Sequence, residues 1–162
     1  MANSENTQPM HTSSTSSPDP ALGRLEKLVG TWELKGRTLN SKEDNITGWT
    51  TFEWMPGGFF LQSVGEINFN GFIIQSLEII ACDPKRKTFP SSVYSNMSGT
   101  VLSYEWDVQG NTVIHSGLGW KYTGTFSEDG TILSGGWRPD EGTESTDGNA
   151  YDATMARVED RK

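Results

Sequence analysis

The sequence predicts an all-β protein: a closed up-and-down antiparallel barrel of about ten strands, with a short N-terminal helix. The segment Val29–Leu39 alternates strictly, with Trp32 and Leu34 on one face and charged residues such as Glu33 on the other. This two-residue period is typical of a half-buried strand. Further alternating segments follow at regular intervals, with turn residues between them. No segment between them is long enough for a parallel crossover helix, so the sheet is expected to be antiparallel. Closure into a barrel protects its apolar face and its edges.

Length and composition favour one folded domain with polar ends. The chain has 162 residues, including 18 glycines, 6 tryptophans and 7 phenylalanines. This composition suits a β protein with many turns and bulky interior side chains. We expect a disordered tail at residues 1–19, the barrel domain at residues 20–158 and a C-terminal tail at residues 159–162. The polar ends contain too little apolar surface to offset the entropy cost of ordering them.

The charge of the chain argues against two classes of partner. Its formal net charge is −8, which disfavours binding to nucleic acid and to anionic lipid. No apolar run approaches the roughly 18–20 residues of a membrane span, so no membrane association is expected. Cys82 is the single cysteine, which excludes an intrachain disulfide. The N-terminus also lacks the basic and apolar regions of a signal peptide, and together these features predict a cytoplasmic protein.

A short helix is expected immediately before the first strand. Asp19 can cap its first turn. Pro20 suits the first helical position, because a backbone N–H there would have no intrahelical acceptor and its absence costs no hydrogen bond. One apolar stripe follows at helical spacing. The stripe consists of Leu22, Leu25 and Leu28. A helix of two turns with one apolar stripe needs a surface to cover, and we expect that surface to be an open end of the barrel. Gly30 then ends the helix.

The later strands are bounded by turn residues, of which Asn70-Gly71 is the strongest hairpin signal. The expected strands cover residues 46–55, 59–69, 72–82, 88–96, 100–108, 112–118, 120–126, 131–138 and 151–158. Phe72–Cys82 is apolar on both faces, so it is expected to be the most enclosed strand. Pro90 cannot donate to the hydrogen-bond ladder and predicts a bulge or an opening in its strand.

Four blocks of the chain resemble a known family. Leu25–Leu34 resembles the helix and Gly-x-Trp opening of lipocalin-like (calycin) barrels. Together with Glu53–Leu61, Leu77–Asp83 and Tyr122–Gly130, it resembles more narrowly a family of bacterial barrels described only as a domain of unknown function. The resemblance spans nearly the whole folded region. It implies an up-and-down barrel with an internal small-molecule cavity, and it implies no reaction. The C-terminal strand departs from the pattern, because Asn149–Ala153 stands where Trp-rich sequence is expected.

The resemblance also implies a structural pair. In calycins, an arginine from a late strand typically covers the tryptophan of the Gly-x-Trp motif. Trp32 matches that tryptophan, and Arg157 is the candidate partner because it shares a strand face with Tyr151 and Met155. Cation–π stacking of this kind contributes about 0.5–2 kcal/mol. Trp32 would then mark the closed end of the barrel, and a ligand is expected toward the opposite end.

Aromatic side chains on the expected inward faces are the candidate ligand contacts. In a barrel wide enough to hold a cavity, inward positions toward the open end also face a ligand. Tyrosine and tryptophan add polar groups to an apolar wall, which suits a lipid-like or aromatic small molecule. The candidate ligand-binding residues are Phe52, Trp54, Tyr104, Trp106, His115, Trp120 and Tyr122.

His115 and Glu78 are the two candidates for other chemistry. A haem needs only one axial histidine, so His115 is a candidate haem ligand, although an ordinary histidine on a strand face is the simpler interpretation. No cluster of ligand residues has metal-site spacing, so no metal is expected. An inward Glu78 would be a candidate acid or base. Alternation with Leu77 and Ile79 on the inner face instead favours an outward Glu78.

Three functions remain open from the sequence. The first is a non-enzymatic barrel that encloses a hydrophobic or aromatic small molecule. The second is a haem-binding barrel with His115 as axial ligand. The third is a small enzyme, an isomerase, hydratase or cyclase, in which Glu78 and His115 both face the cavity as an acid/base pair. The sequence contains no recognised catalytic motif, which favours the binding barrel over an enzyme.

Overall fold

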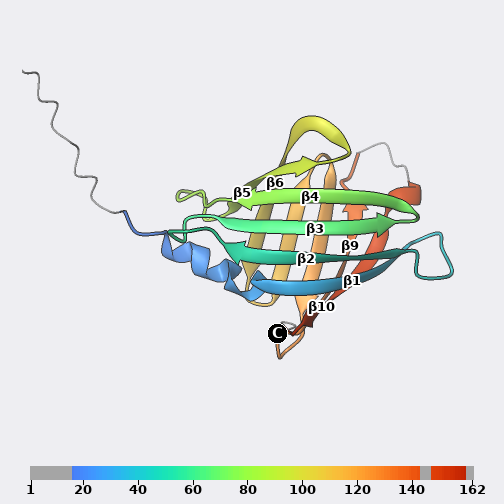
Figure 1. Cartoon of the computed structure of the whole chain (residues 1–162), viewed down its shortest axis with the longest axis horizontal. Coiled ribbons are helices and arrows are strands. Elements are labelled where there is room, and N and C mark those ends of the chain that lie inside the picture. The colour runs from blue at the N-terminus through green and yellow to red at the C-terminus, as the bar shows by residue number, and fades with distance from the viewer. Residues whose placement is uncertain (1–15, 143–146, 160–162) are drawn as a thin grey trace, which may run out of the picture.

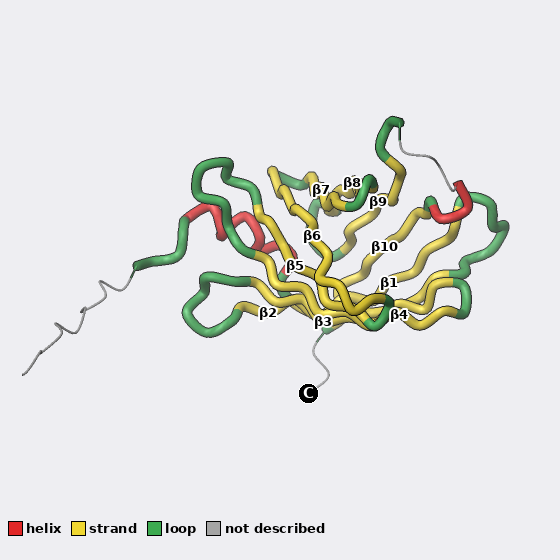
Figure 2. Tube along the Cα trace, turned by 90° about the horizontal axis from the view of Figure 1, so that it is seen from above, coloured by secondary structure: helices red, strands yellow, loops and turns green. Residues whose placement is uncertain are grey.

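Ten antiparallel strands close into a barrel in the computed structural model, which describes residues 16–142 and 147–159. Each strand pairs with the next one in sequence, and the last strand returns to pair with the first (Figures 1 and 2). The elements are η1 (Pro20–Leu28), β1 (Gly30–Thr38), β2 (Ile46–Trp54), β3 (Leu61–Phe69), β4 (Phe72–Ile80), β5 (Phe89–Ser95), β6 (Ser98–Gln109), β7 (Thr112–Gly117), β8 (Trp120–Phe126), β9 (Ile132–Pro139), η2 (Asp147–Asn149) and β10 (Tyr151–Val158). The predicted fold class is therefore confirmed. Most of the predicted N-terminal tail (residues 1–15) and the last three residues lie outside the described residues.

The N-terminal helix covers one end of the barrel, as expected, while η2 lies at the opposite end (Figure 1). The N-terminal helix η1 is a 3₁₀ helix, and its N-cap Asp19 accepts a 2.8 Å hydrogen bond from the Ala21 N–H. The buried side chains of the helix are the three expected leucines, Leu22, Leu25 and Leu28. Within residues 16–142 and 147–159, no helix combines the length and the apolar character that crossing a membrane requires.

Large apolar side chains fill the half of the barrel beneath η1. They come from the strand ends nearest the helix and pack with its leucines in one cluster. Fully or almost fully buried members include Trp32, Leu61, Ile80, Phe89, Val113 and Leu133. This half of the barrel is solid, so an interior space can exist only toward the end opposite η1.

Trp32 and Arg157 meet where β1 and β10 close the barrel. The two residues are direct cross-strand partners, and the Arg157 guanidinium lies 4.3 Å from the centre of the Trp32 ring system. The guanidinium also donates hydrogen bonds to the carbonyl oxygens of Val29 and, at 2.9 Å, Lys27. Because these carbonyls lie at and just beyond the last turn of η1, Arg157 ties the end of the helix to the closing pair of strands.

The structure corrects the expectation for β4. Phe72, Ile73 and Leu77 are 57%, 42% and 36% exposed, so this is not the most enclosed strand. The strand alternates as strands do, but its inward set contains Ser76 and Glu78. Apolar residues occupy both faces, since Ile74 and Ile80 lie inward while Ile73 and Leu77 lie outside, and hydrophobicity alone therefore does not identify the inward face.

Two smaller differences concern the neighbouring strands. β3 begins at Leu61 rather than at residue 59, because Gly57 and Gly58 adopt positive φ angles and the chain reaches the ladder only after this turn. Pro90 lies inside β5 and is exposed, whereas the irregularity in that strand falls later, between Val93 and Ser95. The Asn70-Gly71 hairpin is confirmed, with φ angles of 51° and 94°.

Replacing Arg157 should test its contribution to barrel closure. We expect Arg157→Met to lower the free energy of unfolding by about 1–2 kcal/mol, because the cation–π contact and the bonds to the helix carbonyls are lost. Urea unfolding followed by tryptophan fluorescence measures the change. Arg138→Met is the matched control, since Arg138 forms an exposed ion pair with Asp152 that should contribute about 0–1 kcal/mol. Equal losses in the two variants would contradict a special role for Arg157.

Candidate functional site

An interior cavity of about 310 Å³ occupies the barrel toward the end opposite η1. This size lies at the lower end of the range of about 300–1,000 Å³ typical of small-molecule sites. The lining is predominantly apolar and aromatic, with a few polar side chains. Five of the seven predicted ligand-binding residues line it. They are Phe52, Tyr104, Trp106, His115 and Tyr122.

The other two predicted residues lie outside this lining. Trp54 packs near the helix end, where its indole N–H donates a 2.8 Å hydrogen bond to Glu26 of η1. Trp120 is the first residue of β8 and pairs with Pro139 at the end of β9. Both residues stand at strand ends. Alternation gives the face on which a side chain lies, but not its depth along the barrel axis.

The cavity exists because small side chains face large ones across the barrel. Thr50, Gly65, Ser76 and Ser95 are direct neighbours in register across β2–β5. On the opposite wall, across β7–β10, the row in register consists of His115, Tyr122, Trp137 and Tyr151. Both rows line the cavity. The small row supplies the space, and the aromatic row supplies the apolar wall.

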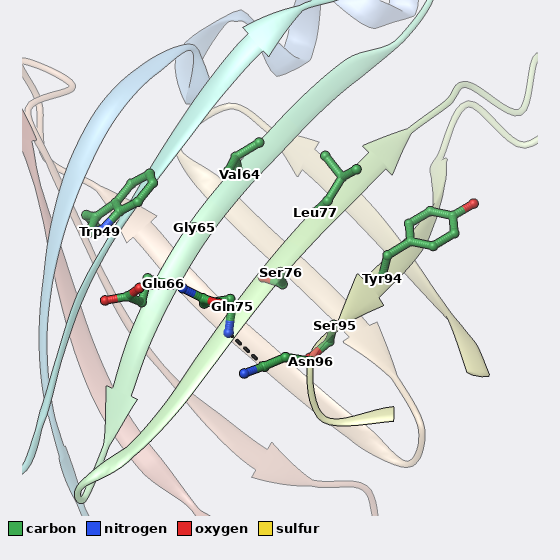
Figure 3. Close-up of a pocket in the computed structure, with 10 residues that line it drawn as sticks. All are labelled: Trp49, Val64, Gly65, Glu66, Gln75, Ser76, Leu77, Tyr94, Ser95 and Asn96. Atoms are coloured by element: carbon green, nitrogen blue, oxygen red, sulfur yellow. Dashed lines mark hydrogen bonds between the residues drawn. The ribbon is translucent and has the colours of Figure 1, made fainter. Parts of the chain in front are cut away.

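Figure 3 shows the outer side of the small-residue wall. There the side chains of Trp49, Val64, Leu77 and Tyr94 stand on the outer face around a solvent-open groove. Gly65, Ser76 and Ser95 contribute to both the groove and the interior cavity. The wall is therefore thin at this row, and the groove and the cavity lie on its two sides.

Glu78 is the only carboxylate among the cavity-lining residues, and it points inward, so the expectation of an outward Glu78 is wrong. The residue is 7% exposed. Its Oε1 accepts hydrogen bonds from Ser91 Oγ at 2.6 Å, Trp106 Nε1 at 2.8 Å and His115 Nε2 at 3.1 Å. These donors come from β5, β6 and β7, so a single oxygen atom joins three consecutive strands to β4.

These partners keep Glu78 ionised despite its burial. Burial by itself raises the pKa of a carboxyl group. The charge of His115 and the hydrogen bonds from His115, Ser91 and Trp106 act in the opposite direction, and together they hold the Glu78 pKa below its ordinary value. An anionic side chain therefore faces an otherwise apolar cavity at neutral pH.

The contact with Glu78 also fixes the orientation of His115. An ionised carboxylate can only accept, so Nε2 carries a proton and donates it toward Glu78. The imidazole ring is stacked on Trp106, with 3.8 Å between ring centres and 15° between planes. Nδ1 has no hydrogen-bond partner among the described residues. A histidine held in this way can exchange a proton at Nδ1, with the carboxylate stabilising the imidazolium form.

Tyr122 lines the cavity, but its hydroxyl is buried over Gly124, which is not among the lining residues. The residue is 7% exposed, and its hydroxyl oxygen is buried without a hydrogen-bond partner in the described part of the chain. Burial raises the pKa of Tyr122 far above the ordinary tyrosine value, so the hydroxyl stays protonated. Its ring lies over Gly124, where an added Cβ would come within 2.6 Å of the ring. A buried hydroxyl without a partner is costly unless a ligand or a water molecule satisfies it.

The residues around His115 do not fit a haem bound through its Nε2. That nitrogen is engaged by Glu78, and Trp106 covers one face of the ring. Tyr104 and Trp137 pack on the ring as well, at 5.1 Å and 5.2 Å between ring centres. An iron atom would have to displace the Glu78 carboxylate, which would then lose its charged partner. For metal ions, no group of three or more ligand residues occurs among the described residues.

Sequence reasoning missed several residues of this site. Nothing in the sequence marks Ser91 or the small-residue row of β2–β5 as inward, because serine and glycine are equally typical of the outer face of a strand or of a turn. Trp137 and Tyr151 lie in predicted strands, and their alternation with buried Leu133 and Ala153 would have placed both inward. The pairing of Glu78 with His115 joins residues 37 positions apart and depends on how the barrel closes.

The fold and the cavity within it define the class: a closed ten-stranded antiparallel β-barrel that could hold a ligand. Residues 17–125 match DUF1579, described as a protein of unknown function, and the chain belongs to this family. No curated protein matches the chain. Among solved structures, the chain is similar in fold to Rv2717c from M. tuberculosis. The TM-score is 0.58 at 14% identity, and the match covers 88% of this chain and 100% of that one.

The stability contributed by Glu78 should depend on pH. The pKa of Glu78 is lower in the folded state than its ordinary value, so the ionised side chain stabilises the fold at pH values above the ordinary carboxyl pKa. This stabilisation is lost as the pH falls through the folded-state pKa. We expect Glu78→Gln to lower the free energy of unfolding at pH 7, and this difference from the wild type should shrink as the pH falls below about 4.5. Urea unfolding at several pH values measures it. A difference that is constant or that grows in acid would contradict the inferred ionised Glu78.

Proposed function

We propose that this protein binds a small hydrophobic or aromatic molecule inside its barrel. The observation that carries the proposal is the 310 Å³ cavity between the small-residue row and the aromatic row. A barrel with no ligand would be more stable with larger side chains at Ser76 or Ser95, since empty interior space costs dispersion contacts.

The resemblance of the opening helix and strand to lipocalin-like barrels is consistent with this proposal. The lipocalin assignment is itself part of the proposal, since it rests on the Gly-x-Trp motif and on the contact between Trp32 and Arg157. Both features belong to the closed end and leave the ligand unspecified. The chemistry of the ligand must therefore be inferred from the cavity wall.

Filling the cavity should abolish binding. We expect the neutral fluorescent probe N-phenylnaphthylamine to bind the wild type with an increase in emission, and Ser76→Phe to lower its affinity by at least about tenfold by occupying the space. Gln75→Phe is the matched control, because it adds the same side chain one residue away on the outer face. Equal binding by the wild type and Ser76→Phe would mean that the probe, and by extension a ligand, binds elsewhere.

An acid/base enzyme is the second candidate function, and the contact between Glu78 and His115 inside the cavity supports it. His115 Nδ1 could remove a proton from a carbon next to a ligand carbonyl, and the imidazolium formed would be stabilised by Glu78. Return of the proton at the same or another position is the core step of an isomerase. A haem function through His115 is supported less, because Nε2 is engaged by Glu78.

Isotope exchange tests the enzymatic candidate directly. With acetonaphthone in deuterium oxide, an active base should catalyse exchange of the methyl hydrogens for deuterium, detected by mass spectrometry. His115→Gln should abolish this exchange and Glu78→Gln should slow it by about 10²–10⁴-fold, the usual contribution of a positioned acid/base group. Exchange at the buffer rate with the wild type would contradict catalysis of this reaction, while leaving the binding function intact.

A further inference from the structure

We propose that the cavity selects a cationic ligand: a primary ammonium group carried on an aromatic or alkyl body. This inference rests on the proposed binding function and specifies the chemistry of the ligand. It begins from the charges that face the cavity. Among the lining residues, Glu78 is the single carboxylate, His115 is the only other side chain that can be charged near neutral pH, and neither lysine nor arginine contributes. A fatty acid or another carboxylate would therefore meet the Glu78 anion, and no lysine or arginine of the lining could pair with it.

Glu78 retains the capacity to bind a further donor. All three of its hydrogen bonds are accepted by Oε1, and Oε2 has no hydrogen-bond partner within the described part of the chain. An ammonium N–H donating to an ionised carboxylate forms a charge-assisted hydrogen bond, which is about twice as strong as a neutral one. The residue is also held rigidly by its three partners, so little ordering is needed when the ligand binds.

The aromatic wall suits the same charge. Trp137 lies between Tyr104 and Tyr122, with ring centres 6.4 Å and 5.8 Å away. These rings line the same cavity as Glu78, and the faces of aromatic rings bind ammonium groups through cation–π attraction.

A matched series of three ligands tests the proposal. Naphthylmethylamine, naphthalenemethanol and naphthoate, all substituted at the same ring position, share one aromatic body and differ in charge. Isothermal titration calorimetry at pH 7.5 should give the amine an affinity at least about tenfold higher than the alcohol, with the carboxylate weakest.

The variants identify the group responsible. Glu78→Gln should remove the preference for the amine over the alcohol while leaving the alcohol bound. Glu66→Gln is the matched control, because Glu66 is a carboxylate on the outer face of β3 that bonds to Gln75, and it should keep the preference. If Glu78→Gln does not fold, the order of affinities measured with the wild type decides the question, because only an anionic recognition group places the amine above the alcohol and the carboxylate last.

Each outcome supports or overturns the inference. Equal affinity for the amine and the alcohol, or tightest binding of the carboxylate, overturns it and leaves the binding function in place. Tightest binding of the carboxylate would identify a protonated His115, rather than Glu78, as the recognition group. If none of the three ligands binds and N-phenylnaphthylamine also fails to bind, the proposed binding function itself fails.

Discussion

In a closed barrel, every second side chain of ten strands must fit into an interior of fixed width, and this constraint determines where the protein is solid and where it is hollow. Beneath η1 the inward residues are large, and the three helix leucines complete their packing. Toward the other end, a row of small residues on β2–β5 faces aromatic residues on β7–β10. The same alternation therefore produces the core at one end and the cavity at the other.

The buried carboxylate of Glu78 is the feature that gives this cavity chemical character. Removing an ionised group from water is costly, and the interior compensates with three donors on one oxygen atom. The donors belong to three different strands, so the arrangement also orients His115 and fixes which of its nitrogens carries the proton. A wall that required only packing would be satisfied more simply by an apolar residue at this position.

The sequence allowed the architecture to be predicted because the fold is built from local signals. Alternation marked the strands, Gly, Asn and Pro marked the turns, and Asp19 with Pro20 marked the start of the helix. The candidate site was predictable only in part. Alternation predicted Phe52, Tyr104, Trp106 and Tyr122, which line the cavity, but it also predicted Trp54 and Trp120, which lie outside this lining. His115 was selected as the only histidine of the predicted folded region, and Glu78 was expected on the wrong face. The prediction for Glu78 was wrong because it took the apolar neighbour Leu77 as inward, whereas Leu77 is exposed and Glu78 is buried.

The sequence by itself therefore determined the number and order of the strands, the helix that covers one end and most of the aromatic side chains available to a ligand. These depend on the two-residue period of a strand and on turn preferences, which act between residues close in the chain. Only the tertiary structure decided that Glu78 meets His115, that Tyr122 stays unpaired and that small residues face aromatic ones across the cavity. The reason is physical: those relations join strands that are distant in sequence, and they are set by the register and curvature with which the barrel closes.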